Sequence, residues 1–307
     1  MSNATWMSDM ASAIGGRKLK EVALPGTHDS GTYAISADSD FSPDNPNDAK
    51  DFIKKYLESV PYLDIPAKKI FAGWAKSQSK NITDQLEAGI RYLDLRVCRR
   101  SGNDMYIVHG MYAENVNVVI DAVHTFVTNN DKEIIILDFN HFYEMTTGSH
   151  NALVSKLIST FGNVLAPRSF TVDATVNDLW AKKQRVIILY GNGDAVTANA
   201  QLWSQSSISS PWPNKTDTAS LKNALEGELP NKRDTFFVLQ GVLTPDGEMI
   251  KKGFLPDHWH SLEDVAKDTT PKVVGWIKDL WANQNLNIVI VDWFEVSNYV
   301  DVVKSLS

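Results

Sequence analysis

Two histidines in this 307-residue chain follow short apolar runs of the kind that form β-strands. His28, with Asp29 directly after it, comes just past Val22–Leu24, and His109 comes just past Tyr106–Val108. In a barrel of parallel strands the carboxyl ends gather on one rim, and catalytic residues lie on that rim. Two imidazoles can begin a reaction in opposite protonation states, because the pKa of imidazole lies close to neutral. The pair therefore indicates general acid–base chemistry.

Charged side chains accompany two other apolar runs. Asp94 and Arg96 belong to the run Arg91–Val97, and Asp292 lies in the run Ile288–Trp293. A carboxylate beside an imidazole fixes the tautomer of the ring and favours its cationic form. A guanidinium can hold two non-bridging phosphate oxygens in its planar fork. Together with the two histidines, these groups suffice to cleave a phosphodiester without a metal.

Apolar runs and helical stripes alternate along the chain. The runs that predict buried strands are Glu21–Leu24, Arg91–Val97, Met105–Val108, Ile134–Phe139, Val186–Tyr190, Phe236–Leu243 and Ile288–Trp293. Several are continuous and rich in Ile, Val and Leu, as parallel strands covered on both faces are. Apolar stripes predict helices over 116–127 and 153–161, and Thr270-Pro271 predicts the start of another. The alternation predicts an α/β fold, a (β/α) barrel, with residues 1–307 forming a single domain.

Two segments fit this plan less well. Residues 36–80 are polar and rich in Asp at first, then apolar and aromatic, and are expected to form a partly helical insertion. Long insertions in compact domains are often lids or substrate loops, and we expect that role here. Residues 199–220 are expected to form a loop at the rim. Within it, Trp212 lies between two prolines and is expected to contact the rim or a lipid.

Composition excludes several classes of function. The chain is 43% hydrophobic and 22% charged, which is ordinary for a soluble globular protein. Its net charge of -7 argues against nucleic acid as a partner and against lasting adhesion to anionic lipid. No apolar run approaches the length of a membrane span, and Met1–Lys20 has no apolar core of a signal peptide. We expect a soluble monomer, either cytoplasmic or secreted with its signal peptide removed. Cys98, the only cysteine, leaves the compartment open.

Three motifs together resemble a known family. They are Pro-Gly-Thr-His-Asp-Ser-Gly-Thr-Tyr (25–33), Gln-Leu-Glu-Ala-Gly-Ile-Arg-Tyr-Leu-Asp-Leu-Arg (85–96) and Val-His-Gly (108–110). In this order they look like the X domain of phosphatidylinositol-specific phospholipase C, of the X-domain-only and small bacterial type. The resemblance runs from Trp6 to Trp293. It implies a distorted TIM-type barrel that acts on phosphatidylinositol, or a related inositol phospholipid, at a membrane surface.

The resemblance also implies a role for each candidate residue. His28 matches the general base, which takes the proton from the inositol 2-hydroxyl before that oxygen attacks phosphorus. His109 matches the general acid, which protonates the departing diacylglycerol oxygen. Asp29 matches the partner of His109, and Asp292 matches the residue that orients His28. Arg96 matches the arginine that neutralises phosphate charge in members without a metal. The products would be diacylglycerol and inositol cyclic phosphate.

Metal dependence follows from two positions. Calcium-dependent relatives usually carry Asn after the first His and an acidic residue in place of the arginine. This chain has Asp29 and Arg96 there, so the resemblance implies no metal and no other cofactor. The alternative is a calcium-assisted version of the same reaction, with Asp94, Asp138 or Asn140 as ligands.

The headgroup site departs from the bacterial pattern. Bacterial members place a lysine after the fourth strand and an arginine after the fifth, where this chain has Asp138–His141 and Tyr190–Gly193. The headgroup preference therefore stays open. His141 is undecided between a contact at the rim and a structural role. The residues expected to line the substrate site are Asp94, Asn140, Tyr190 and Trp212.

A function of a different class is a catalytically weak module on the same barrel, which binds lipid or another protein. A pure binding module has no need of two oriented imidazoles. The set His28, His109 and Arg96 therefore favours an enzyme.

Overall fold

A computed structural model of the chain describes residues 3–44, 67–229, 234–253, 255 and 257–307. Its centre is a 10-stranded sheet in which the order β7-β6-β5-β2-β1-β10-β9-β8 is parallel throughout. Off this path, β3 pairs with β2, and β4 pairs with β3. The strands are β1 (Leu24–Thr27), β2 (Tyr92–Ser101), β3 (Asp104–Val108), β4 (Tyr112–Asn115), β5 (Ile135–Tyr143), β6 (Val186–Tyr190), β7 (Leu202–Ser204), β8 (Ile208–Ser209), β9 (Phe236–Gln240) and β10 (Ile288–Val291).

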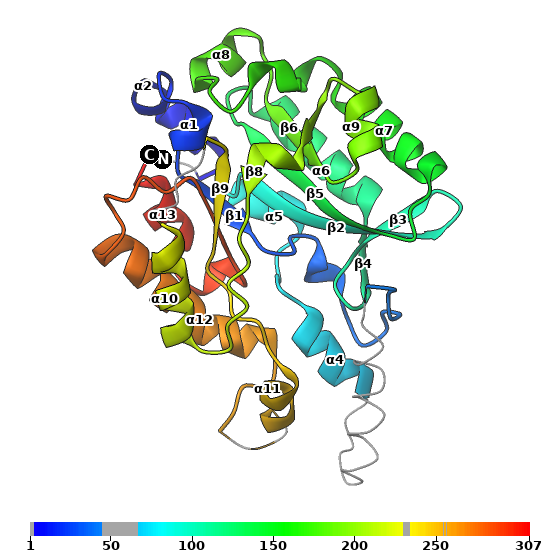
Figure 1. The fold of residues 1–307 in the computed structure, drawn as a ribbon, viewed down its shortest axis with the longest axis vertical. Coiled ribbons are helices and arrows are strands. Elements are labelled where there is room, and N and C mark those ends of the chain that lie inside the picture. The colour runs from blue at the N-terminus through cyan, green and yellow to red at the C-terminus, as the bar shows by residue number, and fades with distance from the viewer. Residues whose placement is uncertain (1–2, 45–66, 230–233, 254, 256) are drawn as a thin grey trace.

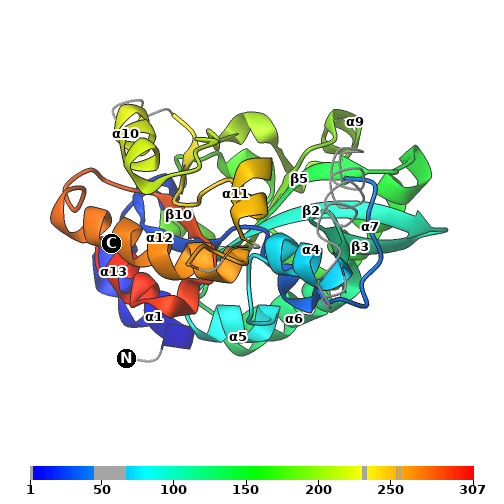
Figure 2. The same ribbon diagram turned by 90° about the horizontal axis from the view of Figure 1, so that it is seen from below.

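Helices surround the sheet (Figure 1). They are α1 (Trp6–Asp9), α2 (Ala11–Ile14), α4 (Ala67–Ala75), α5 (Ile82–Glu87), α6 (Val116–Asn129), α7 (Thr147–Phe161), α8 (Val176–Ala181), α9 (Gly193–Ala198), α10 (Thr218–Glu228), α11 (Gly247–Lys252), α12 (Leu262–Asp279) and α13 (Tyr299–Lys304). Figure 1 shows α6 to α9 on one side and α10, α12 and α13 on the other, while α4 and α11 project at the lower end. Seen from below, α4 and α11 lie in front of the strands (Figure 2).

One short stretch of chain joins the two edges of the sheet. β7 pairs with β6, and β8 pairs with β9. Between them lies only the 3-10 turn η6 (Gln205–Ser207). Because residues 202–209 pair first with one edge and then with the other, the curled sheet forms a nearly closed barrel. The predicted barrel fold is confirmed.

Alternate residues along each strand pack on opposite sides of the barrel wall, as the period of a strand requires. In β6, Ile187 and Leu189 join a cluster with Ile136 and Ile290, whereas Ile188 and Tyr190 join the cluster that the outer helices cover. The stripe predicted for residues 116–127 is buried along α6. The strands are therefore covered on both faces, and their continuous apolar runs follow from that.

The first strand and α12 begin at other residues than the sequence predicts. β1 runs over Leu24–Thr27, whereas Leu19–Glu21 is a 3-10 turn. A Cβ at Gly26 would lie 2.9 Å from both Tyr92 Cδ1 and Ile290 Cγ2, so only glycine lets the strand pass between its neighbours. The predicted helix start at Thr270-Pro271 is also wrong. α12 begins at Leu262, is capped by Ser261 and contains Pro271, because its long apolar face is buried.

The run Met105–Val108 is not a parallel barrel strand. β3 pairs antiparallel with β2, with Val97 opposite Ile107. β2 continues well past the rim to Ser101, and a hairpin brings the chain back. His109 therefore lies beside Arg96 at the rim, although β3, the strand before it, is antiparallel to β2.

The two predicted irregular segments differ in outcome. Of residues 36–80, the structure shows α4 in the second half, with Phe71 and Trp74 on it. Residues 45–66 lie outside the described residues. Residues 199–220 are not one loop at the rim. They include β7, η6 and β8, and Trp203 is buried in β7, whereas Trp212 is exposed.

The described chain ends lie on the same side of the molecule in both ribbon views (Figures 1 and 2). Lys304 Nζ donates a hydrogen bond to Asn3 Oδ1 and joins them. Among the helices in the described ranges, none is long and apolar enough to cross a membrane.

Candidate active site

The first histidine lies between two neighbouring strand ends. His28 and Asp29 follow β1, and Asp292 follows β10. Thr27 pairs with Val291 across these parallel strands, so the next residues also stand side by side. His28 Nδ1 lies 2.8 Å from Asp292 Oδ1. The register of two parallel strands therefore forms the histidine–carboxylate pair.

Arg96 approaches from β2, the neighbour of β1 on the other side. Its Nε lies 2.9 Å from Asp29 Oδ1, and its Nη2 lies 3.4 Å from His28 Nε2. The Arg96 side chain is 27% exposed, whereas that of Asp29 is only 1% exposed. The guanidinium thus covers a buried carboxylate and still reaches solvent.

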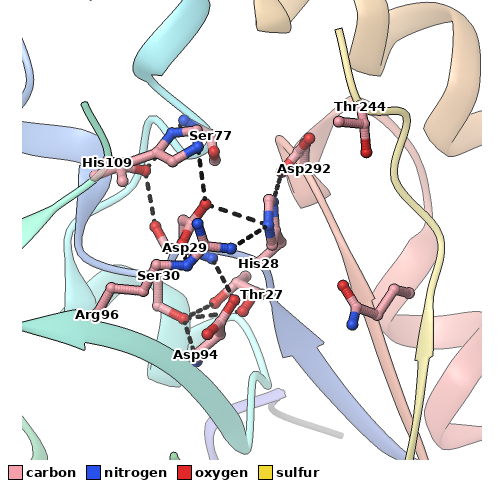
Figure 3. A network of polar contacts seen from close by, with 12 residues as sticks. Thr27, His28, Asp29, Ser30, Ser77, Asp94, Arg96, His109, Thr244 and Asp292 are labelled. Atoms are coloured by element: carbon pink, nitrogen blue, oxygen red, sulfur yellow. Dashed lines mark hydrogen bonds and ion pairs between the residues drawn. The ribbon is translucent and has the colours of Figure 1, made fainter. Parts of the chain in front are cut away.

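His109 completes the group from the turn between β3 and β4 (Figure 3). Its Nδ1 lies 2.8 Å from the carbonyl oxygen of Ala75, the last residue of α4. Its Nε2 lies 3.5 Å from Asp29 Oδ2, and the centroids of the two imidazoles are 6.2 Å apart. Gly110, at a φ of 69°, turns the chain sharply after the ring.

These contacts fix both tautomers. A carbonyl or carboxylate oxygen accepts, so Nδ1 of each ring is the atom that keeps its hydrogen. Each ring therefore gains and loses its proton at Nε2. His28 Nε2 lies 3.2 Å from Asp29 Oδ2, the same oxygen that His109 Nε2 faces. One carboxylate oxygen thus lies between the two atoms that exchange protons.

Burial and charge act against each other on these groups. Burial opposes protonation of His28, but Asp29 and Asp292 outweigh it and raise the pKa of His28 from 6.5 to about 9. Burial likewise opposes ionisation of Asp29, but Arg96 and the two histidines lower its pKa to about 2. Burial raises the pKa of the Asp292 carboxyl. The free protein therefore holds an anionic Asp29 among positive groups at neutral pH.

The backbone is strained on both sides of the His28–Asp292 pair. Asp29 and Trp293 each adopt a φ of 44°, a left-handed conformation that residues other than glycine rarely take. Such residues cost about 1–3 kcal/mol each and persist only where the surrounding structure holds them. The position of the Asp29 carboxylate depends on this conformation.

A cavity of about 430 Å³ opens beside Arg96 at the rim. Most of the side chains that line it carry a polar group, and the lining consists of Tyr92, Asp94, Arg96, Asp138, Asn140, His141, Gln205, Ile208, Ser210, Trp212, Gln240 and Ile290. Amide, hydroxyl and carboxylate groups of this kind recognise a ligand rich in hydroxyl groups.

The carboxylates of the lining already have hydrogen-bond partners. Asp94 Oδ1 accepts from Asn140 Nδ2 at 2.6 Å, and Asp94 Oδ2 accepts from the Asp29 backbone N at 3.0 Å. Asp138 accepts from Tyr92 Oη at 2.7 Å and from Gln205 Nε2 at 2.6 Å. Burial raises the pKa of Asp138 to about 6 despite these bonds.

Comparison with known proteins agrees with this geometry. Residues 69–191, which include Arg96 and His109, match the family model described as phosphatidylinositol-specific phospholipase C, X domain. The PI-PLC X domain-containing protein 3 of Danio rerio is 31% identical over 310 residues, covering 99% of this chain and 93% of the relative. The PI-PLC X domain-containing protein 2 of Homo sapiens is 33% identical over 258 residues, covering 82% and 81%. The chain belongs to the phosphatidylinositol-specific phospholipase C X-domain family.

Solved structures show that this X-domain chain shares its fold with bacterial enzymes. The phosphatidylinositol-specific phospholipase C from Listeria monocytogenes matches with a TM-score of 0.68 at 17% identity, over 100% of this chain and 99% of that one. The S. aureus phosphatidylinositol-specific phospholipase C matches with a TM-score of 0.68 at 16% identity, over 99% and 97%. Identities this low concern the fold alone.

The X-domain barrel brings most of the predicted residues together. His28, Asp29, Arg96, His109 and Asp292 form the group above. Asp94, Asn140 and Trp212 line the cavity, and Trp212 is 61% exposed at its mouth. His141, which the sequence left undecided, also lies at the rim, where its Nδ1 is 2.7 Å from Asn140 Oδ1.

Tyr190 does not line the cavity of the X-domain barrel. Its side chain is only 1% exposed, and its hydroxyl lies 2.9 Å from Nδ1 of His150 on α7. The alternation of β6 turns Tyr190 toward the outer helices, where it packs against Phe139 and Phe142. Its prediction as a substrate contact is wrong, because the end of a strand alone does not say which way the last side chain points.

Other residues of the site had no signal in the sequence. Gln205, Ser210 and Gln240 reach the cavity from the segment that closes the barrel and from β9. Asp44 Oδ2 accepts from the N–H of Gly110 at 2.9 Å, directly after His109. Polar residues of these types are common at surfaces, and only the closed barrel places them here.

Proposed function

We propose that the chain is a phosphatidylinositol-specific phospholipase C that works by general acid–base catalysis. The observation that supports this best is that two imidazole Nε2 atoms face one oxygen of Asp29, with Arg96 beside them. One imidazole can then accept a proton while the other donates one, and the guanidinium supplies positive charge beside them. An in-line attack on a phosphodiester needs this arrangement.

The reaction begins at the neutral form of His28, which is the minor form at neutral pH because the pKa of this ring is raised to about 9. Nε2 takes the proton of the inositol 2-hydroxyl, and that oxygen attacks phosphorus. The new bond joins the 2-oxygen to phosphorus, and the bond between phosphorus and the glycerol oxygen breaks. Asp292 holds the ring through Nδ1 and stabilises the imidazolium that forms. The products are diacylglycerol and inositol cyclic phosphate.

The leaving oxygen takes its proton from the side of His109. Because Ala75 O accepts from Nδ1, His109 donates its proton from Nε2, the atom that lies 3.5 Å from Asp29 Oδ2. Asp29 and His109 therefore act as one acidic unit next to the glycerol oxygen. Arg96 neutralises the charge that develops on the non-bridging oxygens.

We propose that no metal ion takes part. The only described group of possible ligands is His28, Asp29 and Asp94, whose ligand atoms lie within 4.8 Å of one another. Arg96 contacts the first two of these residues, and Asp94 is bonded to Asn140 and to the Asp29 backbone. A guanidinium in that place supplies positive charge and repels a cation.

The test is an assay with short-chain phosphatidylinositol below its micelle concentration. Release of diacylglycerol together with inositol cyclic phosphate is expected. An analogue without the 2-hydroxyl is the matched control and should bind without reacting, because it lacks the nucleophile. Binding of the natural lipid with no cyclic product would identify a lipid-binding module instead and overturn the proposal.

A further inference from the structure

Four consecutive residues, the last of α4 and the three that follow it, contact each of the three loops that carry a candidate catalytic residue. Residues 75–78, here called the rim clamp, connect α4 to α5 along the rim of the barrel. Ser77 and Gln78 are fully buried, although both are polar. Among the described residues, Gln78 Oε1 has no hydrogen-bond partner. A buried amide with an unpaired oxygen destabilises the fold, so its other contacts need an explanation.

The rim clamp holds the loop after β10 through Trp293. The backbone N–H of Trp293 donates to Ser77 O at 2.9 Å, and its indole Nε1 donates to Lys76 O at 3.0 Å. These two hydrogen bonds hold Trp293, which has a φ of 44° and directly follows Asp292. The contact therefore stabilises the strained conformation that positions the Asp292 carboxylate.

The rim clamp holds the loop after β1 through two routes. Gln78 Nε2 donates to His28 O and to Val291 O, each at 2.9 Å, and so ties β1 to β10 where both strands end. The N–H of Ser77 donates to Thr32 Oγ1 at 3.0 Å, and that hydroxyl donates to Asp29 O at 2.7 Å. The rim clamp therefore also holds Asp29, the second residue with a φ of 44°.

The third loop is held by the last residue of α4. Ala75 O accepts from Nδ1 of His109 at 2.8 Å, so the clamp sets the tautomer of this ring. A backbone carbonyl cannot be replaced by mutation, whereas the amide of Gln78 and the hydroxyl of Thr32 can. These two side chains give experimental access to the clamp.

We propose that the rim clamp, residues 75–78, aligns the two imidazoles with Asp29 and Asp292, and that Gln78 is a positioning residue for the reaction. Only the expected change in kcat rests on the proposed function. The distance between His28 and Asp292 is a property of the protein itself, and it can be followed without substrate.

Loss of the Gln78 amide has a defined consequence. The ends of β1 and β10 lose a bridge, so Asp292 moves away from His28 Nδ1 and stabilises the imidazolium less. The other charged groups facing the ring are Asp29 beside it, Asp94 and Arg96 from β2, and His109 from the β3–β4 turn. None of them touches Gln78 in the described contacts, so the change should act through Asp292.

The experiment compares Gln78→Met with Asn287→Leu. Asn287 is also buried, and its Nδ2 also donates to two backbone carbonyls, those of Leu19 and Val22, at the opposite end of the barrel. Both variants lose a buried amide that bridges two carbonyls, so both should lower Tm. Only Gln78→Met should lower kcat, by about 10-fold or more with KM changed little, because misplacement of catalytic groups acts on the reaction step.

NMR titration of His28 gives the readout that needs no substrate. We expect Gln78→Met to lower the pKa of His28 toward 6.5, and Asn287→Leu to leave it unchanged. Thr32→Val, which keeps the shape and removes the hydroxyl, is the second variant in case Gln78→Met does not fold, and it should lower kcat through Asp29. An unchanged His28 pKa and kcat in folded Gln78→Met, or an unchanged kcat in Thr32→Val where Gln78→Met does not fold, would overturn the rim clamp. If the wild type shows no phospholipase C activity but Gln78→Met still lowers the pKa of His28, only the proposed function is overturned.

Discussion

Two arginines close together in the sequence are both paired with a buried carboxylate, at opposite ends of the barrel. Arg91, just before β2, bonds Glu133 Oε2 through Nε at 2.9 Å and through Nη2 at 2.6 Å. Its remaining donors reach backbone carbonyls, those of Asn3, Ala4, Leu86 and Ile90. The Arg91 side chain is 0% exposed. This guanidinium has no donor left for a ligand.

Arg96 is the contrasting case. Its described partners are Asp29 and His28, it is partly exposed, and it lines the cavity. A guanidinium has five N–H donors, so several remain for an incoming anion. Pairing with a carboxylate alone therefore does not distinguish a structural arginine from one that can bind phosphate. The distinction is how many of its N–H donors are already bonded within the protein.

Removal of either imidazole should have the largest effect of all on activity. We expect His28→Ala and His109→Ala each to lower kcat by at least ~10²-fold, the usual range for lost acid–base catalysis. The double variant should cost less than the two single losses combined, because the two rings act through one carboxylate. Steady-state kinetics on short-chain phosphatidylinositol checks this. Near-normal turnover in a single variant would remove that histidine from the mechanism.

Replacing each arginine in turn with methionine separates their roles. Arg96→Met should lower kcat/KM by roughly 10²–10³-fold with a small change in Tm, since it removes electrostatic stabilisation of the phosphate. Arg91→Met should lower Tm by about 10 °C, because Glu133 stays buried without its partner. The folded Arg91 variant should retain its kcat. A loss of activity in both variants at equal Tm would show that donor counting does not separate the two classes.

The carboxylate beside His28 sets the pH dependence. Asp292→Asn removes a charge that favours the imidazolium, so the pKa of His28 should fall from about 9 toward 6.5. The limb of the kcat/KM profile that follows His28 should move to lower pH with it. Cationic His28 stabilises the fold fully below about pH 6.5 and loses this contribution as the pH rises through about 9. NMR titration and pH profiles of both proteins check these shifts, and an unmoved His28 pKa would contradict the assignment.

The strand-end rule explains which parts of the site the sequence could predict. His28 and Asp292 follow β1 and β10, which are neighbours in the barrel, so their residue types and positions suffice to bring them together. His109 also lies where the sequence places it, but for another reason. β2 overshoots the rim, and the antiparallel β3 brings the chain back to it. No apolar pattern distinguishes such a hairpin from a parallel strand.

The remaining parts depend on contacts that a sequence does not encode locally. Ala75 acts through its backbone carbonyl, so its side chain gives no signal. Gln205 reaches Asp138 only because η6 closes the barrel. Thr270-Pro271 is a good helix start by its residue types, yet burial of α12 extends that helix through the proline. Thr270 instead donates its hydroxyl to Asp292 O at 2.9 Å, a role that appears only in the folded chain.

The smallest expected effect is the response to metal removal, and it tests what Arg96 replaces. An excess of chelator should leave the wild-type rate unchanged, because the guanidinium already lies against Asp29 and His28, where a cation would bind. The matched variant is Arg96→Asp, which exchanges the cation for a possible ligand. It should lose most activity, and calcium should restore part of it, since Ca²⁺ favours several carboxylate oxygens at one site. A wild-type rate that falls on chelation and returns with calcium alone would overturn the metal-free mechanism. It would leave the two histidines in their roles, because they act on protons whichever cation neutralises the phosphate.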